Sequence, residues 1–161
     1  MKKPLTPEEA LYRAAALCST AERCASEIEE KLSRWGVASP DIRRIVAHLH
    51  KEGYIDEARY CRSFVHDKIQ FDRWGRLKIS AALRQKRLPD AAVADALALI
   101  DETSYRQLLR ELIDRKRRQL DGSDPRADKA KLLRFALSRG FETGIIFSIL
   151  GRDDYDDTCD D

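Results

Sequence analysis

Apolar residues recur with a period close to 3.6 along much of the chain, which predicts amphipathic helices. Three such stretches, beginning at Lys31, Ala82 and Phe135, align with one another without gaps. Each stretch carries three apolar anchors spaced five residues apart, and successive stretches are offset by 51 and 53 residues. The anchors are Leu32, Val37 and Ile42, then Leu83, Leu88 and Val93, then Ala136, Phe141 and Ile146. This spacing indicates an internal repeat.

A residue suited to a helix N-cap stands before the last anchor of each stretch. These residues are Ser39, Asp90 and Thr143, whose side-chain oxygens can accept a hydrogen bond from an unpaired backbone N–H. Pro40 would then occupy the first helical position, where its missing N–H costs nothing. Each stretch therefore predicts a helix, a short turn with a buried apolar residue, and a second helix.

A third amphipathic segment precedes each stretch, at residues 7–18, 56–71 and 104–118. We therefore predict nine helices in an all-α fold of three tandem three-helix repeats. The predicted boundaries are 1–53, 54–102 and 103–152, followed by an acidic, disordered tail at 153–161. Because one such repeat is too small to bury much of a core, neighbouring repeats should stack into an elongated, curved molecule.

Composition supports a soluble helical protein and offers no site for chemistry. Of the 161 residues, 36% are charged, and no apolar stretch approaches the roughly 20 residues that a membrane span needs. The four cysteines and three histidines do not show zinc-ligand spacing, and no phosphate-binding or hydrolase motif occurs. We expect a cytoplasmic monomer that is not an enzyme and uses no metal or other cofactor.

The charge distribution is uneven. Residues 153–161, DDYDDTCDD, hold six aspartates, and without them 30 Lys and Arg face 22 Asp and Glu. The body of the chain thus carries a formal charge of +8, which favours a polyanion or an acidic groove as the partner.

Two groups of basic residues are candidates for this contact. Between Arg73 and Arg87 there are six bases and no acid, and we predict that the arginines form one face of a helix with Ser80 between them. A second row follows the helix predicted at 104–118, where Asp114 interrupts it. A solvated helix surface is the alternative for both groups. The candidate binding residues are Arg73, Arg76, Lys78, Arg84, Lys86, Arg87, Arg106, Arg110, Arg115, Arg117 and Arg118.

A repeated helix-turn-helix reader of DNA sequence is disfavoured. In that motif the helix after the turn enters the major groove and needs basic side chains. The segment 90–101 has none, and the segment 143–150 has no charged side chain at all. Only the first repeat, with Arg43, Arg44 and Lys51, meets the requirement.

The segment GYIDEARY at 53–60, together with Gly75 and RLKISAALRQKRL at 76–88, resembles the RecX family of recombination regulators. Arg87 stands where the family often has glycine. The resemblance implies an elongated all-α protein that lies in the groove of the RecA–DNA filament. It further implies inhibition of strand exchange, of ATP hydrolysis by the filament and of co-protease activity, within recombination, DNA repair and the SOS response. Weak DNA binding also goes with the family, and a DNA-binding helical module that acts without a recombinase is the alternative.

The signature residues of this resemblance predict a structural corner. Gly53 suits the left-handed end of one helix, and Asp56 suits the N-cap of the next. Ile55 and Tyr60 have the spacing of a hydrophobic staple. The signature comprises Gly53, Tyr54, Ile55, Asp56, Arg59 and Tyr60.

Overall fold

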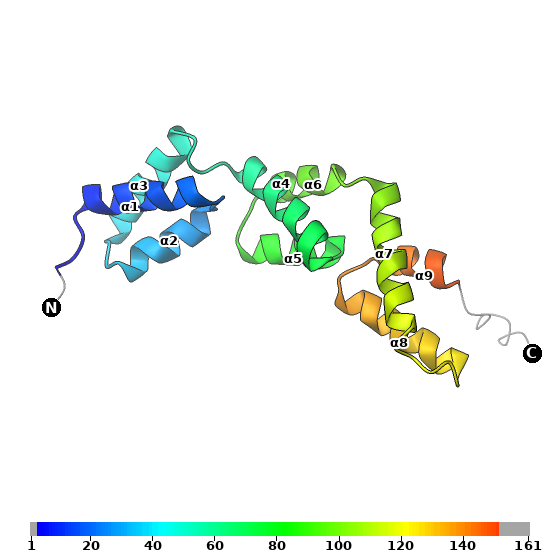
Figure 1. The fold of residues 1–161 in the computed structure, drawn as a ribbon. Coiled ribbons are helices and arrows are strands. Elements are labelled where there is room, and N and C mark those ends of the chain that lie inside the picture. Colours follow the sequence, from blue (N-terminus) through cyan, green and yellow to red (C-terminus); the bar gives the residue numbers. More distant parts are fainter. Residues whose placement is uncertain (1–2, 152–161) are drawn as a thin grey trace, which may run out of the picture. The chain divides into compact units, whose positions relative to one another are not determined.

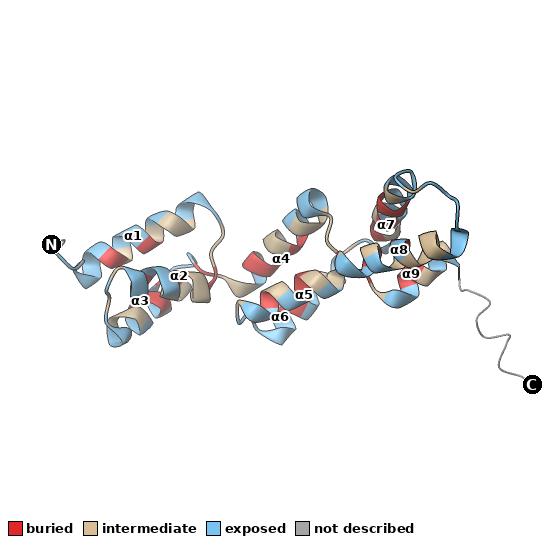
Figure 2. Cartoon of the chain, turned by 90° about the horizontal axis from the view of Figure 1, so that it is seen from below, coloured by how far each residue is buried: buried red, intermediate tan, exposed pale blue. Residues whose placement is uncertain are grey.

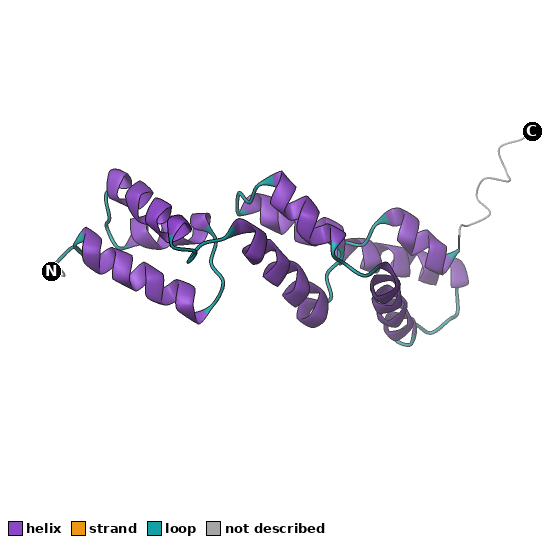
Figure 3. Cartoon of the chain, turned by 90° about the horizontal axis from the view of Figure 1, so that it is seen from above, coloured by secondary structure: helices purple, strands orange, loops and turns teal. Residues whose placement is uncertain are grey.

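A computed structural model describes residues 3–151, and every regular element in that range is helical (Figures 1 and 3). The all-α prediction is therefore confirmed, whereas the predicted shape and repeat boundaries stay predictions. The acidic segment 153–161 lies outside the described residues. The elements are α1 (Pro7–Thr20), α2 (Ala25–Arg34), α3 (Ser39–Lys51), α4 (Glu57–Asp67), the π-helical turn η1 (Lys68–Asp72), α5 (Arg76–Gln85), α6 (Asp90–Ala98), α7 (Glu102–Arg117), α8 (Pro125–Ser138) and α9 (Thr143–Leu150).

The chain forms two compact units, and the helices of the predicted second repeat are divided between them. The first unit contains the residues up to His66 together with Ala82–Ala98. The second contains Asp67–Ala81 together with the residues from Leu99 onward. Helix α5 thus contributes its beginning to one unit and its end to the other.

Helices α1, α2 and α3 pack around one apolar core in the first unit, and the buried residues lie on their inner faces (Figure 2). Two alanines, Ala10 and Ala14, bring α1 close to the larger side chains of α2 and α3. The core is completed by Ile28, Leu32, Ile45, Val46, Leu49 and Ile55.

Helices α7, α8 and α9 form the corresponding core of the second unit. The sequence predicts an apolar stripe of Tyr105, Leu108, Leu109, Leu112 and Ile113 on α7. All five contribute to the core, four of them buried and Leu108 partly buried. The rings of Tyr105 and Phe141 lie 5.2 Å apart between centroids, so the turn between α8 and α9 is packed against α7.

The turn that ends the first helix of each aligned stretch has the same hydrogen bonds in all three. Residues 36, 87 and 140 have positive φ angles of 81°, 62° and 92°. The N–H of the next residue, the apolar anchor, donates to a carbonyl five residues back, as in Val37 to Leu32 at 3.1 Å. This turn explains the constant five-residue spacing, because the left-handed residue folds the anchor back onto its own helix.

Arg87 is the one non-glycine among these three turn residues, so it bears the steric cost of a left-handed backbone. Replacing Arg87 with glycine is expected to stabilise the first unit by roughly 0.5–1 kcal/mol. Glycine removes the steric strain of the left-handed backbone, and this gain exceeds the cost of the extra conformational entropy that glycine gives the unfolded chain. The lost ion pair to Glu29 is exposed and contributes little. Urea unfolding followed by Trp35 fluorescence in a Trp74→Phe background measures this change. Gly36→Ala should shift stability in the opposite direction; equal shifts for both variants would contradict the explanation.

The predicted N-caps Ser39, Asp90 and Thr143 are wrong by one position, because each is already the first helical residue. The carbonyl of the residue before each one accepts the first helical hydrogen bond, as Ala38 does from Ile42 at 3.0 Å. That carbonyl defines the N-cap. Side-chain oxygens of Thr6, Asp101 and Asp124 do cap their helices.

Candidate functional site

The signature segment forms the corner between α3 and α4, as predicted. Gly53 has a φ of 78°, and its N–H donates to the carbonyl of His50 at 3.1 Å. The Asp56 carboxylate then accepts from the N–H of Arg59 at 2.9 Å. Ile55 is 2% exposed and joins the core of α1–α3, whereas Tyr54 is 40% exposed. The corner is thus held by a glycine turn, a carboxylate cap and one buried side chain.

Arg59 gives this corner a stabilising contact that its place in the sequence does not reveal. Its guanidinium donates to the carbonyls of Gly53 and Tyr54 at 3.0 and 3.3 Å. Its Nε donates to Glu22, which precedes α2, at 2.5 Å. Arg59 therefore satisfies carbonyls in the turn that follows α3 and ties the corner to the α1–α2 connection.

The predicted arginine face at 73–87 is not one helix face. Helix α5 covers only Arg76–Gln85, so Arg73 and Arg87 lie outside it, both with positive φ. Ser80, placed by the sequence argument between the arginines, is only 9% exposed. One helix face was predicted because Arg73, Arg76, Ser80, Arg84 and Arg87 are spaced 3, 4, 4 and 3 residues apart. This requires a continuous helix from 73 to 87, but the helix does not extend to the left-handed residues Arg73 and Arg87.

The run from Arg73 to Arg87 contains no acid, but this does not leave its bases without acidic partners. Carboxylates from outside the run approach these bases within each compact unit. Arg73 lies 4.0 Å from Glu111, Arg84 3.7 Å from Asp90, Lys86 3.7 Å from Glu27 and Arg87 3.2 Å from Glu29. The ammonium of Lys78 lies 4.6 Å from the centre of the Trp74 ring. Whether these residues also bind a partner stays a prediction.

Arg76 lies at the centre of a half-buried network in the second unit. Its guanidinium donates to Glu142 at 2.7 Å, forms an ion pair with Glu102 and lies 4.0 Å above the Tyr105 ring. The Tyr105 hydroxyl accepts from the Arg76 N–H at 2.9 Å and donates to Glu142. Burial and the neighbouring Glu142 carboxylate raise the pKa of Tyr105, so the hydroxyl stays protonated as a donor. The hydrogen bond from Arg76 lowers the pKa of Glu102, which stays ionised.

Two glycines bring the beginning of α5 against the α8–α9 turn within the second unit. The N–H of Gly75 donates to the carbonyl of Arg139 at 2.7 Å, and Leu77 donates to Gly140 at 2.9 Å. A Cβ atom on Gly75 would lie 2.5 Å from the backbone nitrogen of Phe141. A Cβ atom on Gly140 would lie 2.6 Å from the backbone nitrogen of Lys78. Sequence analysis missed this junction, although a glycine directly before a helix is compatible with close backbone approach.

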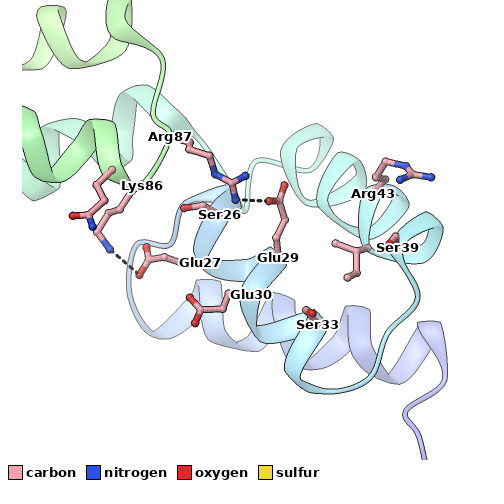
Figure 4. A pocket seen from close by; sticks show the side chains of 11 residues that line it. Ser26, Glu27, Glu29, Glu30, Ser33, Ser39, Arg43, Lys86 and Arg87 are labelled. Carbon is pink, nitrogen blue, oxygen red and sulfur yellow. Dashed lines mark hydrogen bonds and ion pairs between the residues drawn. The ribbon is translucent and has the colours of Figure 1, made fainter.

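The first unit contains a surface groove of about 700 Å³ beside α2 (Figure 4). Lys86 and Arg87, in the turn that follows α5, extend toward Glu27 and Glu29 on α2. Burial opposes ionisation of Glu27, but hydrogen bonds from the Cys24 backbone and the Tyr60 side chain outweigh it and lower the pKa of the carboxyl. The cations on one wall are thus neutralised by carboxylates on the other, and the groove has no excess charge to recruit a polyanion.

The predicted row on α7 contains cations that form ion pairs and cations that face outward. Arg106 is paired with Glu102 and donates to Ser148 at 3.0 Å, and Arg117 is paired with Asp114 at 3.2 Å. Arg110, Arg115 and Arg118 are exposed, and no carboxylate among residues 3–151 lies within ion-pair distance of them. We call these three residues the α7 cation row. In the same range, no three His, Cys, Asp or Glu side chains are placed to hold a metal ion, and no helix is both long and apolar enough to span a membrane.

These features define a protein of tandem three-helix domains in which some cations hold the fold and others face outward. Residues 56–97 match the second three-helix domain of RecX, and residues 104–150 match the third. The chain belongs to the RecX family of regulatory proteins. A regulatory role follows from this membership.

Individual relatives agree over most of the chain. Regulatory protein RecX from Chlorobaculum tepidum is 34% identical over 117 residues, covering 73% of this chain and 71% of the relative. Its counterpart from Pseudomonas putida is 30% identical over 152 residues, covering 94% and 96%. Two crystal structures, of a regulatory protein RecX and of RecX from Lactobacillus salivarius, share the fold with TM-scores of 0.83 and 0.81. The first is 24% identical in sequence, and the alignment covers 89% of this chain and 72% of that one. The second is 22% identical, and the alignment covers 89% of this chain and 94% of that one.

Proposed function

We propose that this protein regulates homologous recombination and DNA repair by binding the RecA filament on single-stranded DNA, in its groove. In this proposal it inhibits or modulates the ATPase, strand-exchange and co-protease activities of the filament. It acts as a cytoplasmic monomer without chemistry of its own. Membership of the RecX family is the observation that carries the proposal.

The α7 cation row supports a contact with an acidic surface. Its three guanidinium groups are exposed, so they can pair with carboxylates or phosphates without first breaking an ion pair to residues 3–151. Arg84, with 66% of its side chain exposed and 3.7 Å from Asp90, is a further candidate. The Arg76 guanidinium is occupied inside the second unit, so a direct contact through Arg76 would first have to break its pairing with Glu142 and Glu102.

Several weak contacts along a polymer give a physical route to inhibition. Exposed ion pairs contribute little individually, but contacts on linked domains add through a high effective concentration. A protein bound along the groove in this way blocks access of DNA to the filament without catalysing any reaction.

Reversing the charge of the α7 cation row tests the proposal. The triple change Arg110→Glu, Arg115→Glu and Arg118→Glu should weaken inhibition of filament ATP hydrolysis by roughly tenfold, because exposed charges mainly set association with an oppositely charged partner. The measurement is the concentration giving half-maximal inhibition. A matched control reverses three exposed cations of the first unit, Lys31, Lys51 and Arg62. Equal inhibition by the folded triple variant and the wild type would remove the α7 cation row from the contact.

A DNA-binding module acting without a recombinase is the second candidate, supported by the positive charge of the chain before residue 153. Such a module would bind naked DNA with an affinity that falls steeply with salt. It would also inhibit unrelated DNA-dependent enzymes. Pull-down with RecA filaments beside naked single-stranded DNA separates the candidates, and capture by naked DNA alone would favour the module.

A further inference from the structure

The α7 cation row lies in a unit with excess positive charge. In the second unit, residues 67–81 and 99–151 contain 15 Lys and Arg against 10 Asp and Glu, a formal charge of +5. The acidic segment, residues 153–161, contains six Asp and no Lys or Arg, a formal charge of −6. The acidic segment therefore carries a charge opposite in sign and similar in size to that of residues 67–81 and 99–151.

The row is also within reach of this segment. Helix α9 ends at Leu150, and the hydrogen bond of Arg106 to Ser148 holds its last turn against α7 (Figure 1). Ten residues, 152–161, span up to about 33 Å when extended. Arg110 and Arg118 are eight residues apart, about 12 Å along a helix.

We propose that the acidic segment 153–161 docks on the α7 cation row of its own chain. The guanidinium groups of this row form no ion pair with residues 3–151, and a guanidinium is the side-chain group that pairs best with a carboxylate. A segment attached nearby competes at an effective concentration in the millimolar range. Because the contacts are exposed ion pairs, the docked state is reversible and weakens with salt.

This docking has a consequence that goes beyond the proposed function. The segment covers the cations that an acidic partner would use. It therefore competes with any polyanion for this face and lowers the apparent affinity of the polyanion. Removing the segment, or raising the salt concentration, exposes the row. The segment would mask the α7 cation row from any acidic partner, whether or not that partner is a recombinase.

A spin label on Cys159 tests the docking directly. The other cysteines are poor targets, because Cys24 and Cys61 are buried, and a Cys18→Ala background removes the half-buried Cys18. Burial also raises the pKa of the Cys24 and Cys61 thiols, that of Cys61 to about 11, which slows their labelling at neutral pH. In the full-length chain at low salt, NMR signals of amides around Arg110–Arg118 should lose at least half of their intensity. Addition of 0.5 M NaCl should restore them.

The matched variants decide the site. Changing Arg110, Arg115 and Arg118 to Gln should abolish most of the loss, whereas changing Lys31, Lys51 and Arg62 to Gln should leave it unchanged. Uniform broadening over both units, or loss centred on another surface, would overturn the proposal. A second sample mixes spin-labelled chains with separate isotope-enriched chains that carry no label. If signal intensity is lost only in this mixture, and the loss rises with protein concentration, the contact is between copies and docking within one chain is overturned.

A binding measurement keeps this inference separate from the proposed function. Deleting residues 153–161 should raise affinity for a fluorescent dT oligonucleotide several-fold at low salt, and changing the six aspartates to Asn should do the same. Unchanged affinity for both variants would contradict masking of the row. Failure to bind a RecA filament would instead reject the proposed function and leave the docking result standing.

Discussion

Replacing Gly75 with alanine is expected to destabilise the second compact unit by about 3 kcal/mol, because the new methyl group would overlap backbone atoms of the α8–α9 turn. Flexible side chains could move away, but the carbonyl of Gly140 and the nitrogen of Phe141 are fixed by hydrogen bonds to Leu77 and Ala136. Urea unfolding followed by Trp74 fluorescence, in a Trp35→Phe background, measures the change in the unit that contains the substitution.

Gly144 provides the matched control for this substitution. It lies near the start of α9, and a Cβ atom there would meet nothing within 4 Å. Gly144→Ala should therefore be neutral or stabilise by up to about 1 kcal/mol through better helix propensity. If Gly75→Ala were as stable as Gly144→Ala, the close backbone approach at the junction would be disproved.

Replacing Arg76 with alanine should destabilise the second unit by about 2–3 kcal/mol. The change leaves the half-buried Glu142 carboxylate with only the Tyr105 hydroxyl, and it removes the cation from the Tyr105 ring. The expected loss of stability is smaller than for a fully buried ion pair, because Glu102 is half exposed and water can solvate its carboxylate once Arg76 is removed. The same Trp74 unfolding assay applies.

Arg84→Ala is the control, since its side chain and that of Asp90 are mostly exposed. It should change stability by less than about 0.5 kcal/mol. Equal effects at positions 76 and 84 would refute the assignment of Arg76 to the fold. The expected result also means that loss of partner binding by an Arg76 variant would not identify a contact residue.

The sequence was most informative where the physics is local. Helix positions, the five-residue anchor spacing and the Gly53–Asp56 corner follow from periodicity, left-handed turn residues and capping, all of which act within a few residues. The N-caps were misplaced by one residue, because Ser39 and Thr143 are also acceptable first helical residues and only the backbone hydrogen bonds distinguish the two positions.

The candidate site depended on contacts that periodicity cannot show. The run from Arg73 to Arg87 contains no acid, yet Glu27, Glu29, Glu111 and Glu142 approach it from other helices. Charge along the chain therefore overstated the free positive charge on the surface. On α7, where the predicted row contains its own acid, three arginines remained accessible.

By itself, the sequence determined an all-α chain of repeated helical segments, the family signature and the excess of positive charge. The tertiary structure alone decided which cations are structural and which face outward. It also decided that Gly75 and Gly140 allow two backbones to meet. The physical reason is that helix formation depends on neighbours within about one turn, whereas ion pairing and close packing depend on residues that only folding brings together.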